Sequence, residues 1–308
     1  MGRVDDAQRL ASQQGRAAAP AQAAPEPAPW AFGDDARAPS SAPGAPSAAE
    51  PREEPRGHRA MPEQAGEKTP LQQLDPETAE RLVVSARGSE MLVEQFRVLA
   101  ATLHHAQAAQ TLKTVMVTSA VVGDGKSLVA TNLALTLSES YRRQVLLVDA
   151  DLRRPSLHRL FRVLGTTGLN EGLKAESDEK LALVRISETL TLLPAGRPSA
   201  DPMAGLSSAR MRHIIDEAAA RFDWVILDTP PVGVLADASV LSGMVDGAIL
   251  VVKSGVTPFP QVEAAVAALG RDHILGVLLN AVDPADIHDK GYYYHYYGPD
   301  GDERRSTR

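Results

Sequence analysis

The chain has 308 residues and a net charge of −7, so no overall basic field favours binding to nucleic acid or anionic lipid. It contains no cysteine, which excludes disulfides, thiolate metal sites and cysteine nucleophiles, and which is typical of a cytosolic protein. Hydrophobic residues make up 44% of the chain and charged residues 23%, a composition that allows a substantial globular core.

The N-terminal part of the sequence differs from the rest. Residues 1–75 are dominated by Ala, Pro, Gln, Glu and Arg, and they hold half of the chain's 22 prolines. Proline at this density opposes both helix and sheet, so we expect a disordered leader. No apolar segment typical of a secretory signal follows Met1, and the longest apolar runs are far too short to cross a bilayer. We therefore expect a cytoplasmic protein.

The pattern changes after about residue 76. Residues 89–106 carry apolar side chains at helical spacing. Short apolar runs with the length of buried strands then alternate with helical stretches, which predicts an α/β fold whose mostly parallel sheet is covered by helices on both faces. The predicted strands are residues 114–118, 145–148, 224–227, 248–252 and 274–279, and the predicted helices between them are residues 126–138, 211–221 and 261–269. We expect one domain over residues 76–282.

A phosphate-binding loop follows the first predicted strand. Residues 120–127 read Ala-Val-Val-Gly-Asp-Gly-Lys-Ser, a P-loop (Walker A) pattern with alanine in place of the first glycine. The glycines let backbone N–H groups turn toward phosphates at the positive end of the next helix. The lysine can reach the β- and γ-phosphates, and the serine hydroxyl can ligate Mg²⁺. The predicted nucleotide-binding residues are Gly123, Asp124, Gly125, Lys126, Ser127 and Leu128.

Two other predicted strands end in aspartate, at Asp149 and Asp228. Ligands of open parallel sheets bind beyond the carboxyl ends of the strands, so both carboxylates should face the metal of a bound nucleotide, together with Ser127. Asp151 would share a face with Asp149 if the strand continued, and it is the predicted proton acceptor for an attacking hydroxyl. The alternative is that these aspartates only cap the helices that follow them.

A tyrosine cluster lies near the C-terminus. Five of the six tyrosines fall within residues 292–297, past the last predicted strand and among glycines and charged residues. We expect a flexible tail over residues 283–308 that presents phenols as phosphate acceptors, although an aromatic patch for a partner protein is an alternative. The predicted acceptors are Tyr292, Tyr293, Tyr294, Tyr296 and Tyr297.

Taken together, these motifs resemble those of the bacterial tyrosine kinases of polysaccharide synthesis, including the exosortase-associated autokinases. The resemblance covers residues 89–298 and depends on the P-loop, on residues 145–155 as a second Walker motif, on the Asp-Thr-Pro-Pro stretch at 228–231 and on the tyrosine cluster. It implies a P-loop kinase that uses Mg²⁺ and ATP, with Lys126, Asp149 and Asp151 as catalytic residues. It also implies trans-autophosphorylation within a homo-oligomeric ring.

The same resemblance implies three partners: a second copy of the chain, a transmembrane polysaccharide co-polymerase that recruits it to the inner face of the membrane, and a tyrosine phosphatase. One family feature is incomplete. The Glu-x-x-Arg-x-x-Arg motif of the ring interface is represented by Glu94 and Arg97, with Ala100 in the last position. For Arg153 and Arg154, a contact to phosphate or to a neighbouring subunit and an ordinary surface position are both open.

Two alternative functions are also open. Partition and septum-positioning ATPases share this fold, but they resemble one another in a lysine early in the P-loop, where this chain has Val121. A scaffold gated by nucleotide, with little chemistry of its own, is the second alternative.

Overall fold

The computed structural model describes residues 80–83, 90–163, 167–175, 181–233 and 236–283. The leader predicted over residues 1–75 and the five tyrosines predicted as acceptors lie outside the described residues. No helix in the described part of the chain is both long and apolar enough to cross a membrane.

A seven-stranded sheet forms the centre of the domain, in the order β3-β4-β2-β5-β1-β6-β7. All neighbouring strands run parallel except β3 and β4, which pair antiparallel. The predicted α/β fold with a mostly parallel sheet is confirmed. The strands are β1 Thr114–Ser119, β2 Val145–Asp149, β3 Val184–Arg185, β4 Leu190–Leu193, β5 Trp224–Asp228, β6 Gly247–Lys253 and β7 Ile274–Asn280.

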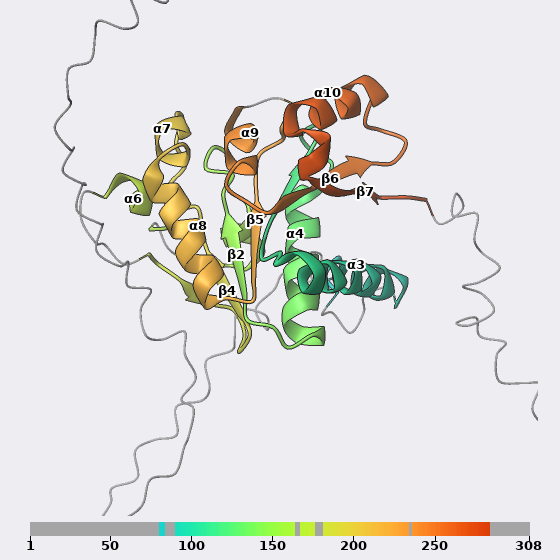
Figure 1. Ribbon diagram of the computed structural model, residues 1–308, viewed down its shortest axis with the longest axis horizontal. Coiled ribbons are helices and arrows are strands. Elements are labelled where there is room, and N and C mark those ends of the chain that lie inside the picture. The colour runs from blue at the N-terminus through green and yellow to red at the C-terminus, as the bar shows by residue number, and fades with distance from the viewer. Residues whose placement is uncertain (1–79, 84–89, 164–166, 176–180, 234–235, 284–308) are drawn as a thin grey trace, which may run out of the picture.

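Helices cover both faces of this sheet (Figure 1). Successive side chains along a strand point to opposite faces, so each buried strand contributes to two hydrophobic cores. On β1, Met116 enters the core beneath α8–α10, whereas Val115 and Val117 enter the core beneath α3 and α4. The helices are α3 Glu90–Gln110, α4 Lys126–Leu135, α5 Leu157–Leu160, α6 Leu169–Lys174, α7 Met203–Leu206, α8 Ala209–Arg221, α9 Ala236–Ser242 and α10 Phe259–Leu269, with a π-helical turn at Thr136–Ser140 and a 3-10 turn at Arg271–His273.

Two features of the sheet differ from the sequence-based expectation. The strand set was incomplete, because β3 and β4 fall in a stretch without regular periodicity and are only two and four residues long. The last strand is also less covered than its apolar sequence suggests. Since β7 is an edge strand, Val277 and Leu279 remain 53% and 61% exposed.

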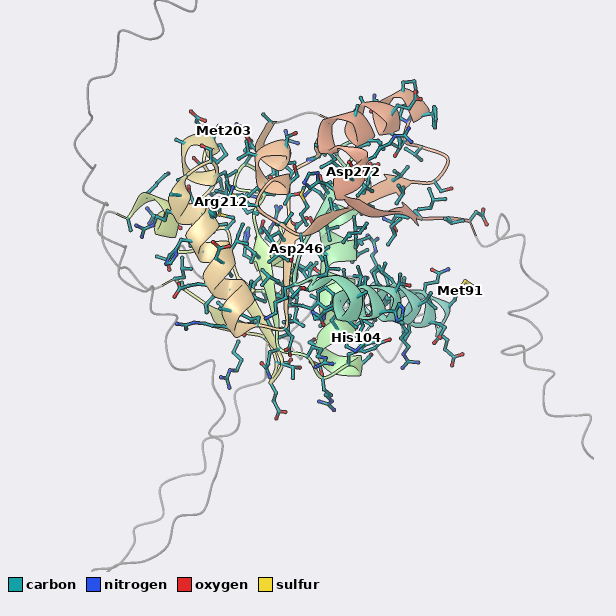
Figure 2. The ribbon with its side chains drawn as sticks, viewed as in Figure 1. Met91, His104, Met203, Arg212, Asp246 and Asp272 are labelled. Atoms are coloured by element: carbon teal, nitrogen blue, oxygen red, sulfur yellow. The ribbon has the colours of Figure 1, made fainter. Side chains whose placement is uncertain are left out.

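The starts of β1 and β6 are joined by Asp246, which is labelled in Figure 2. Its Oδ2 accepts hydrogen bonds from the backbone N–H groups of Lys113 and Thr114, at 2.8 and 2.7 Å, and from the Thr114 hydroxyl at 2.8 Å. This contact fixes the amino ends of the two strands. The opposite, carboxyl ends of the strands carry the predicted site.

Candidate nucleotide and phosphate-transfer site

The phosphate loop connects β1 to α4 as predicted. Gly123 and Gly125 have φ values of 94° and 93°, in the left-handed region that only glycine occupies without strain. A Cβ at Gly125 would also meet the side-chain amide of Asn280, which would then have to move. The left-handed φ is the reason that the loop needs glycine at 125. Leu128 packs its side chain against the core beneath α3 and α4, so only its backbone N–H is suited to contact a nucleotide.

The ammonium group of Lys126 lies among carboxylates. Its Nζ is 2.9 Å from Oδ2 of Asp151, 3.4 Å from Oδ1 of Asp228 and 3.4 Å from the Ser127 hydroxyl. Burial lowers the pKa of this lysine, but Asp228 and Asp151 more than offset burial, so the net shift is upward. Lys126 is therefore a partly buried, charged group at the start of α4.

The two strand-end aspartates lie side by side. Asp149 and Asp228 are register partners in the pairing of β2 with β5, and both are fully buried. Asp149 Oδ2 accepts backbone N–H groups from Ser156 and Leu157, each at 3.0 Å. The capping role considered as the alternative is thus real for this oxygen. The other Asp149 oxygen, Oδ1, is buried without a hydrogen-bond partner among the described residues, and so is Oδ2 of Asp228.

These two unpartnered oxygens fit a hard cation, since carboxylate oxygens are the ligands that Mg²⁺ prefers. No cluster of three or more His, Cys, Asp or Glu side chains suited to a metal occurs within the described ranges. That result agrees with the usual way in which Mg²⁺ is held, by one or two carboxylates together with substrate phosphates. The residues present therefore fit Mg²⁺ that arrives with a nucleotide.

Asp151 lies near the site, but it is not on the strand that its spacing from Asp149 suggested. Strand β2 ends at Asp149, so Asp151 does not share a strand face with it. Asp151 lies in the following loop, where its Oδ1 accepts the backbone N–H of Arg154 at 3.1 Å and its Oδ2 accepts Lys126 Nζ. The loop nevertheless brings this carboxylate, which is 4% exposed, to the same site.

The neighbouring arginines behave differently from each other. Arg153 is bidentate to the buried Asp237 of α9, with Nε 2.6 Å from Oδ2 and a second contact of 3.2 Å to Oδ1, and it also donates to the Ala200 carbonyl. These bonds give Arg153 a structural role in the described state. Arg154 is exposed beside the site. Of the two side chains, the exposed Arg154 is the one that a phosphate or a neighbouring subunit could contact without breaking the bonds of Arg153.

Two residues of the site were missed by the sequence reasoning. The side chain of Asp124, 1% exposed, accepts the Thr257 hydroxyl at 2.6 Å, and its carbonyl accepts Nδ2 of Asn280 at 2.7 Å. For Asn280 a signal existed, because it is a polar residue that ends an apolar strand, as Asp149 and Asp228 do. For Thr257, which follows β6 in an ordinary turn, the sequence offers no comparable signal.

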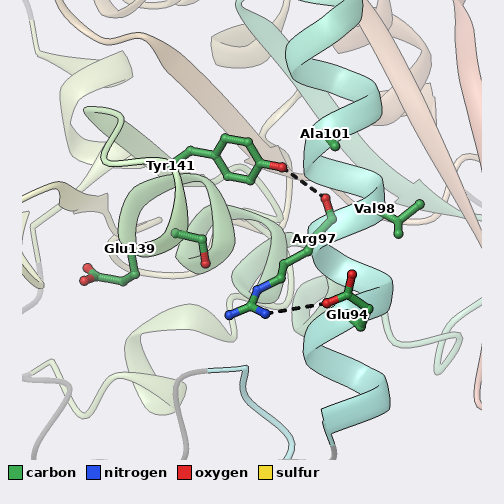
Figure 3. Close-up of a pocket in the computed structure, with 7 residues that line it drawn as sticks. Glu94, Arg97, Val98, Ala101, Glu139 and Tyr141 are labelled. Atoms are coloured by element: carbon green, nitrogen blue, oxygen red, sulfur yellow. Dashed lines mark hydrogen bonds and ion pairs between the residues drawn. The ribbon is translucent and has the colours of Figure 1, made fainter. Parts of the chain in front are cut away.

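The predicted interface motif lies away from this site, on α3. Figure 3 shows Glu94 and Arg97 on the exposed side of the helix, paired at 3.5 Å, beside a cavity of about 620 Å³ that Tyr141 also lines. Ala100 is fully buried in the core with Phe96 and Leu103. Position 100 therefore faces inward in this chain, and the exposed part of the motif ends at Arg97.

Burial sets the protonation of the two strand-end carboxylates. Burial first, and then repulsion from Asp228, raise the pKa of Asp149 from 3.8 to about 7, against the opposing effect of two backbone N–H donors and the Lys126 charge. Burial likewise raises the pKa of Asp228, although the Lys126 ammonium opposes the shift. The two adjacent carboxylates thus resist being charged together while no cation lies between them.

This shift predicts how the metal-free protein responds to pH. Between the unfolded pKa of 3.8 and the folded pKa of about 7, the folded state keeps the Asp149 proton and the unfolded state has lost it. Raising the pH through this window therefore destabilises the folded state, at about 1.4 kcal/mol per unit of pKa difference. Urea unfolding in EDTA should show wild type losing stability relative to Asp149→Asn as the pH rises from about 4 to about 7. A difference between the two proteins that does not change with pH would contradict the assignment.

Comparison with known proteins agrees with this geometry. The family model described as "ParA: NUBPL iron-transfer P-loop NTPase" matches residues 110–282. Tyrosine-protein kinase YwqD of Bacillus subtilis is 37% identical over 203 residues, which cover 65% of this chain and 85% of that protein. The tyrosine-protein kinase wzc of Salmonella typhi is 28% identical over 71% of this chain but only 31% of its own length. The solved kinase domain of the Escherichia coli tyrosine kinase ETK superposes with a TM-score of 0.58 at 31% identity, covering 62% of this chain and 76% of that one.

Proposed function

This chain belongs to the ParA-type P-loop NTPases and, within them, to the bacterial tyrosine-protein kinases, and we propose that it transfers the γ-phosphate of Mg·ATP to tyrosines of its own C-terminal segment. The observation that carries this proposal is the convergence of Lys126 with Asp149, Asp151 and Asp228 at the carboxyl end of the sheet. The identity with named tyrosine kinases favours this function over a partition-type ATPase.

Each side chain has a role that follows from its position. Lys126 neutralises charge on the transferred phosphoryl group, because its ammonium lies at the start of α4 beside the phosphate loop. The free oxygens of Asp149 and Asp228, with the Ser127 hydroxyl, hold Mg²⁺ directly or through water. A Mg²⁺ ion held by these residues would supply positive charge that offsets the charge of the phosphates. The backbone of the glycine loop orients the phosphates by its N–H groups.

Asp151 acts as the proton acceptor. In the described state it pairs with Lys126, and that pair separates when Lys126 turns toward a phosphate. The freed carboxylate then takes the proton of a tyrosine hydroxyl as the phenol oxygen bonds to the γ-phosphorus. The bond between that phosphorus and the bridging oxygen of ADP breaks in the same transfer. The products are phosphotyrosine and ADP, and the proton remains on Asp151.

The acceptors are the five tyrosines of the segment at 292–297, which a neighbouring copy presents in trans. This assignment rests on the sequence, where Tyr141 is the one other tyrosine. Assembly into a homo-oligomeric ring, recruitment to the inner face of the membrane by a co-polymerase, a cognate phosphatase and a role in exopolysaccharide or capsule synthesis and export follow from the family resemblance. The match spans only about a third of the length of the wzc relative.

The test replaces all five tail tyrosines with phenylalanine. We expect most phosphate labelling to disappear while Mg·ATP binding is retained, because the acceptors change and the nucleotide site does not. The matched control is Tyr141→Phe, which removes a hydroxyl that donates to the Arg97 carbonyl at 3.3 Å. Labelling and phosphopeptide mass spectrometry of both variants provide the measurement. Full labelling in the five-tyrosine variant would refute the tail as acceptor, and ATP hydrolysis without any phosphotyrosine in wild type would refute the kinase.

A further inference from the structure

Asn280, the last residue of β7, makes hydrogen bonds through its side-chain amide and its backbone carbonyl. Its Nδ2 donates to the carbonyl of Asp124 in the phosphate loop at 2.7 Å. Its Oδ1 accepts the N–H of Ala281 at 2.9 Å, and its carbonyl accepts the N–H of Ser254 at 2.9 Å. Ala281 has a φ of 54°, an uncommon value for a residue with a Cβ. The edge strand thus ends in a turn that is built around a contact to the phosphate loop.

This contact sets the direction of one peptide group in the loop. The C=O and N–H of a trans peptide point in opposite directions. Since the Asp124 carbonyl is held toward Asn280, the N–H of Gly125 points away from β7. Amide groups of this loop are the donors that phosphates require. Asn280 therefore orients a phosphate-binding donor from a strand at the far edge of the sheet.

A second contact holds the same loop residue from another direction. The Asp124 carboxylate accepts the Thr257 hydroxyl at 2.6 Å through Oδ1 and the backbone N–H of Val121 at 3.1 Å through Oδ2. The Thr257 hydroxyl in turn accepts the N–H of Lys253. The middle of the phosphate loop is thus held through both its side chain and its main chain. The side-chain amide of Asn280 also lies close to Gly125, where it would meet a Cβ.

We propose that Asn280 is a positioning residue for nucleotide binding and phosphate transfer, acting through the Asp124–Gly125 peptide rather than by contact with the nucleotide base. Thr257 supports the same loop through the Asp124 side chain. The inference rests on the proposed function only in taking the P-loop as the nucleotide site. Its value to the enzyme is that the loop amides are already oriented before the phosphates arrive.

The test separates phosphate binding from base binding. Binding of magnesium tripolyphosphate, which has no base, and of Mg·ATP is measured by calorimetry for wild type and Asn280→Ala. Loss of one hydrogen bond of about 1 to 1.4 kcal/mol predicts affinities roughly five- to tenfold weaker, by the same factor for both ligands. Asn280→Asp should be weaker still, because a carboxylate cannot donate to the Asp124 carbonyl and repels it.

Two further variants keep the test decisive. Leu279→Ala is the matched control, since this neighbour on β7 is 61% exposed and its affinities should equal those of wild type. Thr257→Val should reproduce the parallel loss of both ligands if Asn280→Ala does not fold. Weaker ATP binding with unchanged tripolyphosphate binding would overturn the proposal in favour of a base contact. Unchanged binding of both ligands, or an equal loss in Leu279→Ala, would also overturn it.

The outcome is independent of the kinase assignment. Neither binding measurement involves phosphate transfer, so a chain that hydrolysed ATP without phosphorylating tyrosine would give the same binding results. Failure of the kinase proposal would instead be seen in the tyrosine labelling of the wild-type protein.

Discussion

Replacing Lys126 with methionine should reduce tyrosine labelling to background while the domain remains folded. The ammonium group is within 3.4 Å of two carboxylates and is the cation best placed to meet the γ-phosphate. Methionine fills a similar volume but supplies no charge to the transferred group. Loss of one electrostatic contact of this kind costs roughly 10²–10³-fold in rate, and loss of nucleotide affinity adds to that.

The same substitution has a second consequence. Without Lys126, Asp151 and Asp228 lose their shared cation, so the pKa of Asp228 should rise further and the carboxyl should take up a proton. That protonation limits the cost to the fold, which thermal melting followed by circular dichroism would show. Lys113→Met is the charge-matched control, because its ammonium donates to the Ala219 carbonyl at the other end of β1. Wild-type ATP affinity and labelling in Lys126→Met would contradict the role assigned to this lysine.

Asp151→Asn should slow phosphate transfer far more than it weakens ATP binding. A positioned general base contributes roughly 10²–10⁴-fold, and asparagine keeps an oxygen that can accept the Arg154 N–H while it loses the proton-accepting carboxylate. Since the Lys126 pair is also lost, the lysine is released toward phosphate and affinity for Mg·ATP should hold or rise. Single-turnover transfer and calorimetry would measure the two effects separately.

Asp149→Asn supplies the contrast for this prediction. Its Oδ1 is buried without a hydrogen-bond partner and is a proposed ligand of Mg²⁺. The substitution should therefore weaken binding that depends on Mg²⁺ and leave metal-free nucleotide binding nearly unchanged. Opposite patterns in the two variants would confirm separate roles for the two carboxylates. A wild-type transfer rate in Asp151→Asn would show that tyrosine attack needs no proton acceptor at this position.

The sequence allowed much of this site to be predicted, because its main residues are marked by local patterns. The glycines at 123 and 125 indicate a phosphate-binding loop. Asp149 and Asp228 each follow a continuous apolar run, which is typical of a strand buried on both faces of a parallel sheet. The short strand β4 carries no such pattern, since four residues of Leu and Thr between irregular segments fit several structures.

Other features depend on tertiary packing, which local patterns do not encode. Asp151 reaches Lys126 by the course of a loop and not by strand alternation. Thr257 and Asn280 meet Asp124 across 133 and 156 positions of sequence. The inward orientation of Ala100 likewise depends on how α3 packs on the core.

The contact between Asn280 and the phosphate loop also bears on how the protein is made. A chain grows from its N-terminus, and β1, β2 and the loop itself are synthesised well before β7. The loop peptide cannot take its final direction until residue 280 has left the ribosome and β7 has joined the edge of the sheet. An unfinished chain should therefore bind ATP poorly, and stalled nascent chains that end before and after β7 should differ sharply in nucleotide cross-linking.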